Sequence, residues 1–517
     1  MPTSAPQRRT FIAAFVLVAA AIVASLAWVI ASPVGSSPDE DFHVGSMWCP
    51  PPVDETGCQI STKDGEKAVM VPQSLAKEYV TCYAFDHDNS ALCTLNASDE
   101  ELAPTLRWDD GNYPWGYYQF AHLFVQRSTS HAVLALRTVN TLLAVGLIGA
   151  IIALADSGLK RAISVAVTVA WLPMGFYFVA GMNPSSWAMT GTFAFATGLL
   201  AATRSVGARR MGLIACAAAG AVLACTSRGD SAFFLFVITV ALAFAVPLSR
   251  RVIPEATLAC IASVVGIWVM ARTNVAASHL GSGNEMAGYS LSHILWLNVS
   301  ALPTYLRGFV GHGLGPGWND VSYRGTVSVG ASVVVLAVLC WSLRQLTWRK
   351  ALSAITVFGA ITGVPVVIGL RGHFNNVHVY QPRYMLPLFA VFLLMLLAPS
   401  PARANDEGRR VGSEAFRLPT SIAGRVATGL VAALWALTNA RALYLVIERY
   451  AFGRTQHGYP IDLATRNLSA GNEWWWPTAP IGPMATWILG SLAGAIAIGL
   501  AVLLWQRSPE TQPEPRR

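Results

Sequence analysis

The stretch FIAAFVLVAAAIVASLAWVIA, residues 11–31, carries no charge and is long enough to cross a bilayer as a helix. The sequence SPVGSSPDEDFH, residues 32–43, follows at once and places three carboxylates and an imidazole at the expected membrane surface. Acidic groups are costly beside hydrocarbon, so this segment calls for a structural or a chemical reason. The two stretches together predict a membrane-spanning helix with an acidic segment at its outer end.

The composition extends this prediction to the whole chain. Only 12% of the 517 residues are charged and 54% are hydrophobic, whereas a soluble chain carries about 25% charged residues. We therefore expect an all-α polytopic membrane protein. About twelve transmembrane helices are predicted, in apolar windows near 11–31, 132–155, 161–181, 186–203, 211–226, 232–249, 254–272, 326–343, 351–370, 384–399, 424–446 and 482–505.

Basic residues lie mostly in alternate short turns between these windows, so the net charge of +8 indicates topology and not nucleic-acid binding. Placing Arg8 and Arg9 in the cytoplasm makes every cytoplasmic turn basic. We expect a multi-pass protein of the bacterial plasma membrane with both termini cytoplasmic. Its predicted segments are a tail and first transmembrane helix (1–31), a first extracytoplasmic loop with juxtamembrane helices (32–131), transmembrane helices 2–7 (132–272), a second extracytoplasmic loop (273–325), transmembrane helices 8–10 (326–399), a cytoplasmic linker (400–423), transmembrane helices 11–12 (424–505) with an outer loop (448–481), and a disordered cytoplasmic tail (506–517).

Half of the eight cysteines fall in the first extracytoplasmic loop, namely Cys49, Cys58, Cys82 and Cys93. Four cysteines in an oxidising compartment predict two disulfides, for which three connectivities exist. Cys49–Cys58 with Cys82–Cys93 is the local pairing. A zinc site is the competing interpretation, but CxxC spacing is missing from the surrounding sequence.

The acidic segment has two interpretations. Ser37-x-x-Glu40 with Pro38 at the first helical position is a capping box, which predicts a helix that begins at Pro38. Glu40 then bonds back to the Ser37 amide and has a structural role. Asp39 is left free to face a cavity and shares a side with His43, four residues on. This makes Asp39, Glu40 and His43 the candidate catalytic group.

Other polar residues at the outer ends of the spans are candidate substrate ligands. The run 107–120 interleaves aromatic rings with carboxylates and amides, as carbohydrate sites do, although its position favours an interfacial aromatic belt for most of the rings. Arg383 matters most, because a guanidinium entering a span can clamp a phosphate with two parallel hydrogen bonds. A salt bridge from Arg383 to a loop carboxylate is the equally weighted alternative. The remaining candidates are Asp109, Tyr113, His122, Arg137, Asn140, Asn183, Arg228, His378 and Tyr384.

Several of these segments, taken in order, resemble a family of predicted bacterial membrane proteins of unassigned function, catalogued as domain of unknown function 2142. The family's Pro-Asp-Glu-x-x-His is similar to Pro38-Asp39-Glu40 with His43, its Tyr-Pro run to residues 112–118, its Arg-x-x-Asn to Arg137 with Asn140, and its Gly-Arg-Tyr to residues 382–384. The chain departs from the family at Asn183-Pro184-Ser185, where Asn-Pro-Asp is usual. The missing carboxylate speaks against catalysis at that turn.

The family in turn resembles GT-C glycosyltransferases, which implies a fold, a donor and a chemistry. The donor would be a sugar on a polyprenyl phosphate, and the acceptor a glycan, lipid or protein of the cell envelope. Asp39 would take the proton of the acceptor hydroxyl, and Arg383, supported by Arg137 or Arg228, would hold the leaving phosphate. His43 would orient Asp39 or hold a divalent metal ion, since relatives differ in metal dependence.

Two other function classes compete with the enzyme. A transporter or flippase of lipid-linked glycans would use the same outer basic groups, but it should carry charges at mid-membrane depth, and the apolar windows are almost free of them. A non-catalytic scaffold of envelope assembly would need Ser37–Glu40 only as a helix cap. The bilayer is the one partner common to all three.

Overall fold

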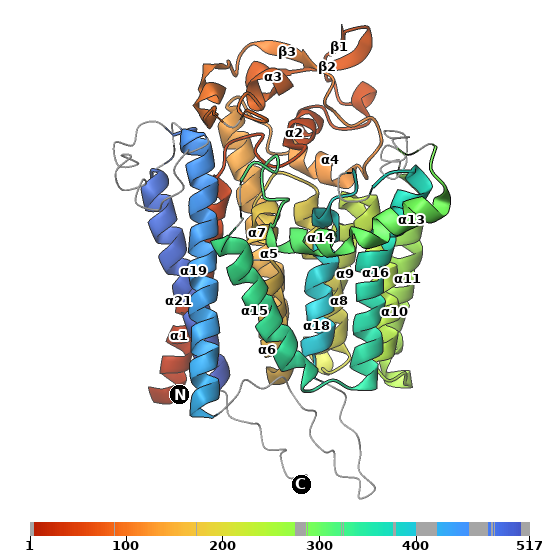
Figure 1. Ribbon diagram of the computed structural model, residues 1–517, viewed down its shortest axis with the longest axis vertical. Helices are drawn as coiled ribbons and strands as arrows, with labels where there is room; N and C mark the ends of the chain where they lie inside the picture. The colour runs from red at the N-terminus through yellow and green to blue at the C-terminus, as the bar shows by residue number, and fades with distance from the viewer. Residues whose placement is uncertain are drawn as a thin grey trace, which may run out of the picture.

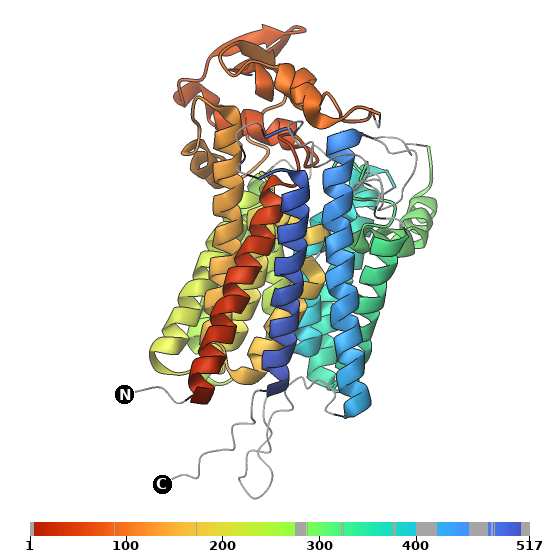
Figure 2. The ribbon, with the colours of Figure 1, turned by 90° about the vertical axis from the view of Figure 1, so that its left-hand side faces the viewer.

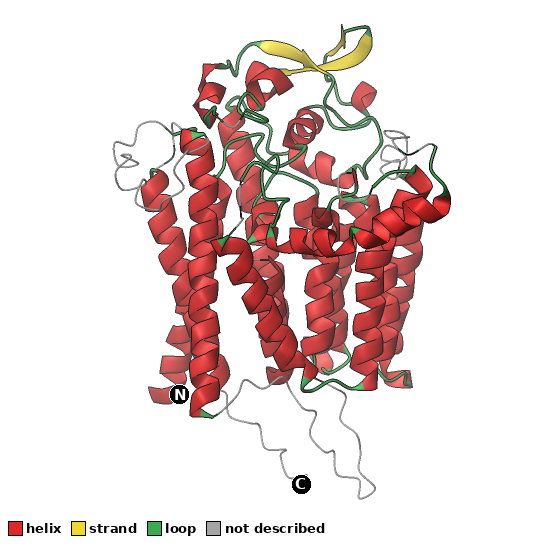
Figure 3. Ribbon diagram, viewed as in Figure 1, coloured by secondary structure: helices red, strands yellow, loops and turns green. Residues whose placement is uncertain are grey.

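The computed structural model describes residues 5–86, 88–171, 173–273, 286, 288–321, 323, 325–375, 379–399, 421–453, 474–476, 479 and 481–507. Long helices run side by side, and a smaller domain built from residues 32–131 covers one end of them (Figure 1). We call this the loop end. The only strands in the described part of the chain lie there (Figure 3).

Helices occupy every predicted apolar window. They are α1 (Ala5–Ile30), α5 (Thr129–Leu154), α6 (Ser157–Trp171), α7 (Met174–Val179), α8 (Ser185–Ala202), α9 (Gly207–Ser227), α10 (Gly229–Ala245), α11 (Ile253–Arg272), α15 (Thr326–Leu343), α16 (Trp348–Gly372), α18 (Leu386–Leu397), α19 (Ile422–Phe452) and α21 (Pro483–Arg507). Eight helices of the described ranges are long and apolar enough to cross a membrane, and two more apolar helices are shorter. A membrane protein with several spans is thereby confirmed, and the count of about twelve stays a prediction.

The predicted span 161–181 is wrong as a single helix. It consists of α6 and α7, which Pro173 separates. Proline has no amide hydrogen and clashes with the preceding helical turn, so it ends a helix readily.

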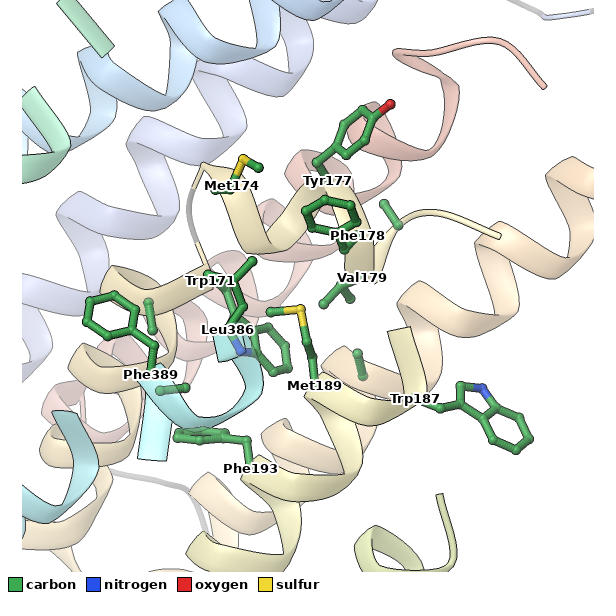
Figure 4. Close-up of a cluster of buried hydrophobic side chains, with 14 of the residues drawn as sticks. Trp171, Met174, Tyr177, Phe178, Val179, Trp187, Met189, Phe193, Leu386 and Phe389 are labelled. Carbon is green, nitrogen blue, oxygen red and sulfur yellow. The ribbon is translucent and has the colours of Figure 1, made fainter. Parts of the chain in front are cut away.

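Small residues bring some of the long helices close together. An added Cβ at Gly191 of α8 would lie 2.6 Å from the Gly220 carbonyl oxygen of α9, so these backbones touch directly. On another side of the bundle, α1, α19 and α21 stand side by side (Figure 2). Beneath the loop end, aromatic and methionine side chains of α6, α7, α8 and α18 converge in a buried cluster around Trp171, Met189 and Phe193 (Figure 4). This cluster packs together the ends of α6, α7, α8 and α18 that lie beneath the loop end.

The domain at the loop end contains α2 (Glu40–Trp48), α3 (Lys77–Val80), α4 (Gly116–His122) and an antiparallel sheet of β1 (Ile60–Lys63), β2 (Glu66–Pro72) and β3 (Leu102–Thr105) in the order β1-β2-β3. In its register Ile60 pairs with Val69, and Val69 pairs with Thr105. The described residues also form shorter helices: η1 (Val53–Glu55), η2 (Gln73–Leu75), η3 (Ala91–Asn96), η4 (Arg250–Val252), α13 (Leu291–Ser300), α14 (Leu302–Arg307), η5 (Gly308–Val310) and η6 (Pro382–Met385).

Two disulfides hold this domain. Cys49 bonds Cys58 with their Cα atoms 5.5 Å apart, and Cys82 bonds Cys93 with a Cα separation of 6.2 Å. The local pairing, one of the three connectivities open to the sequence, is therefore the one formed.

Candidate active site

The acidic segment begins its helix later than predicted. Helix α2 starts at Glu40, and Asp39 precedes it in the left-handed conformation with φ of 62°. The expected start at Pro38 is therefore wrong. Half of the capping box exists, because the Ser37 amide donates to Glu40 Oε2 at 2.9 Å, whereas the Ser37 hydroxyl makes no hydrogen bond within the described residues. The Pro38 carbonyl instead accepts from Asn183 Nδ2 at 3.2 Å, which holds this turn outside the helix.

Asp39 lies between two arginines from distant parts of the chain. Arg383 of η6 donates to its Oδ2 at 2.9 Å, and Arg107, which follows β3, donates to its Oδ1 at 3.2 Å. Arg107 also holds Asp41 through bonds of 2.7 and 3.1 Å. The Asp39 side chain stays 41% exposed, while that of Asp41 is buried. Of the acidic cluster, Asp39 is the carboxylate that a ligand can reach.

The pKa of Asp39 reflects this pairing. Burial raises it, but the charges of Arg383, then His43, and then Arg107 with its hydrogen bond, outweigh burial, so the pKa lies below the usual value of an aspartate. Burial lowers the pKa of His43 to about 3, and the charge of Asp39 only partly opposes this. His43 is therefore neutral near pH 7, and the two guanidiniums are the cations that keep Asp39 ionised there.

His43 lies within a group of aromatic rings. Its Nδ1 is 2.8 Å from the Tyr118 hydroxyl, and its ring centroid is 5.4 Å from that of Tyr113 and 6.0 Å from that of Tyr118. Tyr117 and Tyr118 are buried, because α4 packs directly against α2. These two rings therefore do not belong to the interfacial belt that was expected for most of the run: Tyr118 packs beside His43 of α2, and Tyr117 packs against Trp187 of α8.

Arg228 stands behind this cluster. It is buried and pairs with both carboxylate oxygens of Asp230 at 2.9 Å. Its guanidinium lies 4.7 Å from the Tyr384 ring and 5.7 Å from the Tyr113 ring. The Tyr384 hydroxyl accepts from Arg383 at 3.1 Å. Arg228 thus supports the two tyrosines beside Arg383 and does not touch Asp39 in the described contacts.

Glu40 and Arg137 form a separate, buried ion pair. Arg137 Nη2 donates to both Glu40 carboxylate oxygens at 2.7 and 3.0 Å, and both side chains are at most 1% exposed. Arg137 also donates to the backbone carbonyls of Val29, Ser32 and Pro33. Its donors are directed at the connection between α1 and α2, so this placement favours a structural role over phosphate binding.

The remaining sequence candidates hold the frame of the site. Asn140 donates to the Tyr117 hydroxyl at 3.2 Å and accepts from Trp187 at 3.0 Å. His122 Nδ1 is 3.0 Å from the Met47 carbonyl oxygen, below α2. Asp109 is buried and accepts the Asn112 amide at 2.9 Å. His378 lies outside the described residues.

Asp109 titrates unusually for an aspartate. Burial raises its pKa to about 6, although the amides of Asn112 and Tyr113 favour the carboxylate. Its own amide donates to Ser46 of α2 at 2.8 Å. Asp109 therefore anchors the loop that carries Tyr113.

Asp39 belongs to a cluster of three guanidiniums and three carboxylates whose charges balance. Arg383 and Arg107 pair with Asp39, Arg107 also pairs with Asp41, and Arg228 pairs with Asp230. Within the described residues, Nη1 and Nε of Arg383 make no hydrogen bond, so this guanidinium retains donors for a further anion. No group of three His, Cys, Asp or Glu side chains suited to a metal ion occurs in the part of the chain that the structure describes.

Sequence reasoning missed Arg107, Asp41 and Tyr118. Asp41 stands inside the acidic segment and Arg107 directly precedes the aromatic run, so both were visible as charges. Their pairing joins residues 66 positions apart, and no local pattern indicates it.

Comparison with known families places the chain. A family described as predicted membrane protein, DUF2142, matches residues 12–393, which include the site and most of the helices around it. The chain belongs to this family. No curated protein matches it, and no solved structure matches it. DUF2142 membership confirms the predicted family and a membrane protein of unassigned function; it leaves the GT-C resemblance as a proposal.

Proposed function

We propose that this DUF2142 protein is a GT-C-like glycosyltransferase of the bacterial plasma membrane. It transfers a sugar from a polyprenyl-phosphate-linked donor to a cell-envelope acceptor on the extracytoplasmic face. One observation carries the proposal: Asp39 is a partly exposed carboxylate held between Arg383 and Arg107, where the loop-end domain meets the long helices. A base next to phosphate-binding groups at a membrane surface is what transfer from a lipid phosphate needs.

In the proposed reaction, an acceptor hydroxyl attacks the anomeric carbon of the donor sugar. The new carbon–oxygen bond forms as the bond from that carbon to the phosphate oxygen breaks. Asp39 takes the hydroxyl proton, and the polyprenyl phosphate leaves with the electron pair. Nη1 and Nε of Arg383, which make no hydrogen bond to the described residues, stabilise the charge that develops on the phosphate.

The low pKa of Asp39 fits a donor-dependent base. In the unliganded site two arginines keep the carboxylate ionised but make it a weak proton acceptor. A donor phosphate competes with Asp39 for Arg383. Loss of that cation partner raises the pKa of Asp39 and strengthens it as a base only when the donor is in place.

The decisive variant is Asp39→Asn. Asparagine tolerates the left-handed conformation at this position, so the turn is kept while the base is removed. General-base catalysis typically contributes about a hundred- to ten-thousand-fold in rate. The assay uses purified protein in nanodiscs with a radiolabelled polyprenyl-phosphate sugar and envelope acceptors. We expect Asp39→Asn to transfer sugar at least about a hundredfold more slowly than wild type.

A scaffold is the second candidate, because the one-to-one pairing of charges around Asp39 is also what a purely structural network would show. The same variant separates the two. If Asp39→Asn keeps full transfer but unfolds more easily, the ion pairs around Asp39 are structural and Asp39 is not the base. If it loses transfer and keeps its unfolding free energy, the scaffold is wrong. Wild-type protein without transfer to any envelope acceptor would also contradict the enzyme.

A further inference from the structure

Two aromatic rings from distant segments meet at the loop end, outside the Asp39 cluster. Phe85 is 73% exposed, and its ring centroid lies 5.2 Å from that of Trp318 at an angle of 56°. Trp318 is half-buried, and its Nε1 donates to the Gly35 carbonyl at 2.9 Å. Gly35 belongs to the connection between α1 and α2 that leads to Asp39. Trp318 is thus hydrogen-bonded to the connecting segment that also carries the proposed base, Asp39.

A single buried arginine organises both loops that carry these rings. Arg449, in the last turn of α19, donates to the carbonyls of Tyr83, Asp86 and Asn89 at 2.9, 3.2 and 2.9 Å. The same guanidinium pairs with the buried Asp320 at 2.8 Å, two residues after Trp318. Its planar set of donors is suited to holding several acceptors in one geometry. Arg449 therefore joins the two loops in addition to the contact between the rings themselves.

The backbone around the rings is also constrained. The disulfide Cys82–Cys93 encloses the Phe85 loop. Phe85 itself has φ of 64° and Asn319, beside Trp318, has φ of 63°. A bulky residue in the left-handed region costs about 1–3 kcal/mol and persists where the surroundings enforce it, often at functional sites. A buried arginine, a disulfide and a strained backbone therefore hold the Phe85 ring in place, although most of that ring is exposed to solvent.

We propose that Phe85 and Trp318 form a carbohydrate platform that binds a pyranose unit of the acceptor. This rests on the proposed glycosyl transfer and names where its acceptor glycan is held. The C–H face of a pyranose carries partial positive charge and meets the negative face of an aromatic ring, while its hydroxyls bond to polar groups around the ring. Asp86, Asp88 and Asn89 are exposed beside Phe85 and supply such acceptors.

The surroundings favour a sugar over other occupants. Exposed carboxylates at Asp86 and Asp88 would repel an anionic membrane surface, so the ring is not suited to insertion among lipid headgroups. A stable protein interface needs about 800 Å² from each partner, whereas two aromatic rings offer at most about 150–250 Å² each. An area of that size fits one sugar unit.

The test measures binding and needs no donor. Full-length protein in zwitterionic nanodiscs is examined by saturation-transfer-difference NMR with methyl α-D-glucopyranoside and methyl α-D-mannopyranoside, and with the acyclic polyol sorbitol as the control probe. We expect at least one pyranoside to bind and sorbitol not to bind. Phe85→Ala should weaken that binding by about two- to twelvefold, the loss of one aromatic contact of about 0.5–1.5 kcal/mol. Phe85→Tyr keeps the ring and should retain binding.

Leu102→Ala is the matched control, because Leu102 is likewise an exposed apolar residue but lies on β3. It should bind as wild type does. The inference is wrong if neither pyranoside binds the wild type, if Phe85→Ala binds as well as wild type, or if Leu102→Ala is weakened equally. These results are independent of transfer: a protein that transfers sugar without a functioning platform loses only this inference, and one that binds pyranosides without transfer loses only the proposed enzyme.

Discussion

Glu40→Gln tests whether the buried pair with Arg137 or the helix cap is the main role of Glu40. The variant keeps the size of the side chain and an oxygen for the Ser37 amide. It removes the charge opposite Arg137 and turns an amide NH₂, itself a donor, toward a guanidinium. A lost cap costs about 1 kcal/mol, whereas removing one partner of a buried ion pair costs about 3–5 kcal/mol.

The contacts of Arg137 place the expected loss within that range. Glu40 is 0% exposed and Arg137 is 1% exposed, so water does not screen the charge left behind. The carbonyls of Ser32 and Pro33, both at 2.8 Å, still accept from Arg137 and carry partial negative charge. We therefore expect the lower end, a decrease of about 3 kcal/mol in the free energy of unfolding.

The assay is reversible unfolding in mixed micelles, with the single variants Glu40→Gln and Arg137→Met and the double variant combining them. The double variant removes both buried charges, so its loss of unfolding free energy should be about 2 kcal/mol smaller than the sum of the two single losses. Asp39→Asn, whose side chain is partly exposed, serves as the neighbouring carboxylate control. A loss of only about 1 kcal/mol for Glu40→Gln, with additive variants, would refute the pair as the main role and leave the cap.

Three further outcomes follow from single contacts. An added Cβ at Gly45 would lie 2.2 Å from the Arg107 carbonyl oxygen. Gly45→Ala should therefore lower the free energy of unfolding by about 1–3 kcal/mol in the same assay and displace Arg107 from Asp39. A variant as stable as wild type would contradict this close packing. Burial raises the pKa of Asp109 to about 6 from its usual value near 3.8, so its contribution to stability is full below about pH 4 and is lost as the pH rises through 6. Asp109→Asn should therefore flatten the dependence of the unfolding free energy on pH. An unchanged dependence in the variant would show that Asp109 does not cause it. Alkylation followed by intact-mass analysis should modify four more thiols after reduction than before, because two disulfides are present; modification of all eight cysteines without reductant would exclude them.

Local sequence patterns were sufficient where the cause was local. Apolar windows predicted the positions of the long helices, because an uncharged segment of that length has few alternatives in a bilayer. The bond from the Ser37 amide to Glu40 followed from the spacing of a capping box. Two disulfides were predicted from four cysteines in one outer loop, although the sequence left their connectivity open among three pairings.

Long-range charge pairing could not be predicted in the same way. Arg137 was a candidate substrate ligand that could meet a phosphate or a carboxylate, and its partner is a carboxylate 97 positions away. Arg383 had two equally weighted roles, and the salt bridge to a loop carboxylate is the contact it makes. Arg449, which joins the Phe85 and Trp318 loops, sits in an ordinary helical stretch with no pattern to mark it. Each of these depends on which helices become neighbours, and local spacing carries no information about that.

The left-handed turn at Asp39 explains why two adjacent carboxylates have different fates. In a helix that began at Pro38, Asp39 and Glu40 would point about 100° apart around one helix axis. With Asp39 outside the helix at φ of 62°, Glu40 turns inward to Arg137 while Asp39 stays open between Arg107 and Arg383. Unequal environments for neighbouring acids are the usual means of dividing a structural from a chemical role. The assignment of Asp39 as the base thus depends on this one backbone turn, which Asn183 holds through the Pro38 carbonyl. An Asn183→Ala variant that keeps its fold should therefore lose transfer without any change to a charged group.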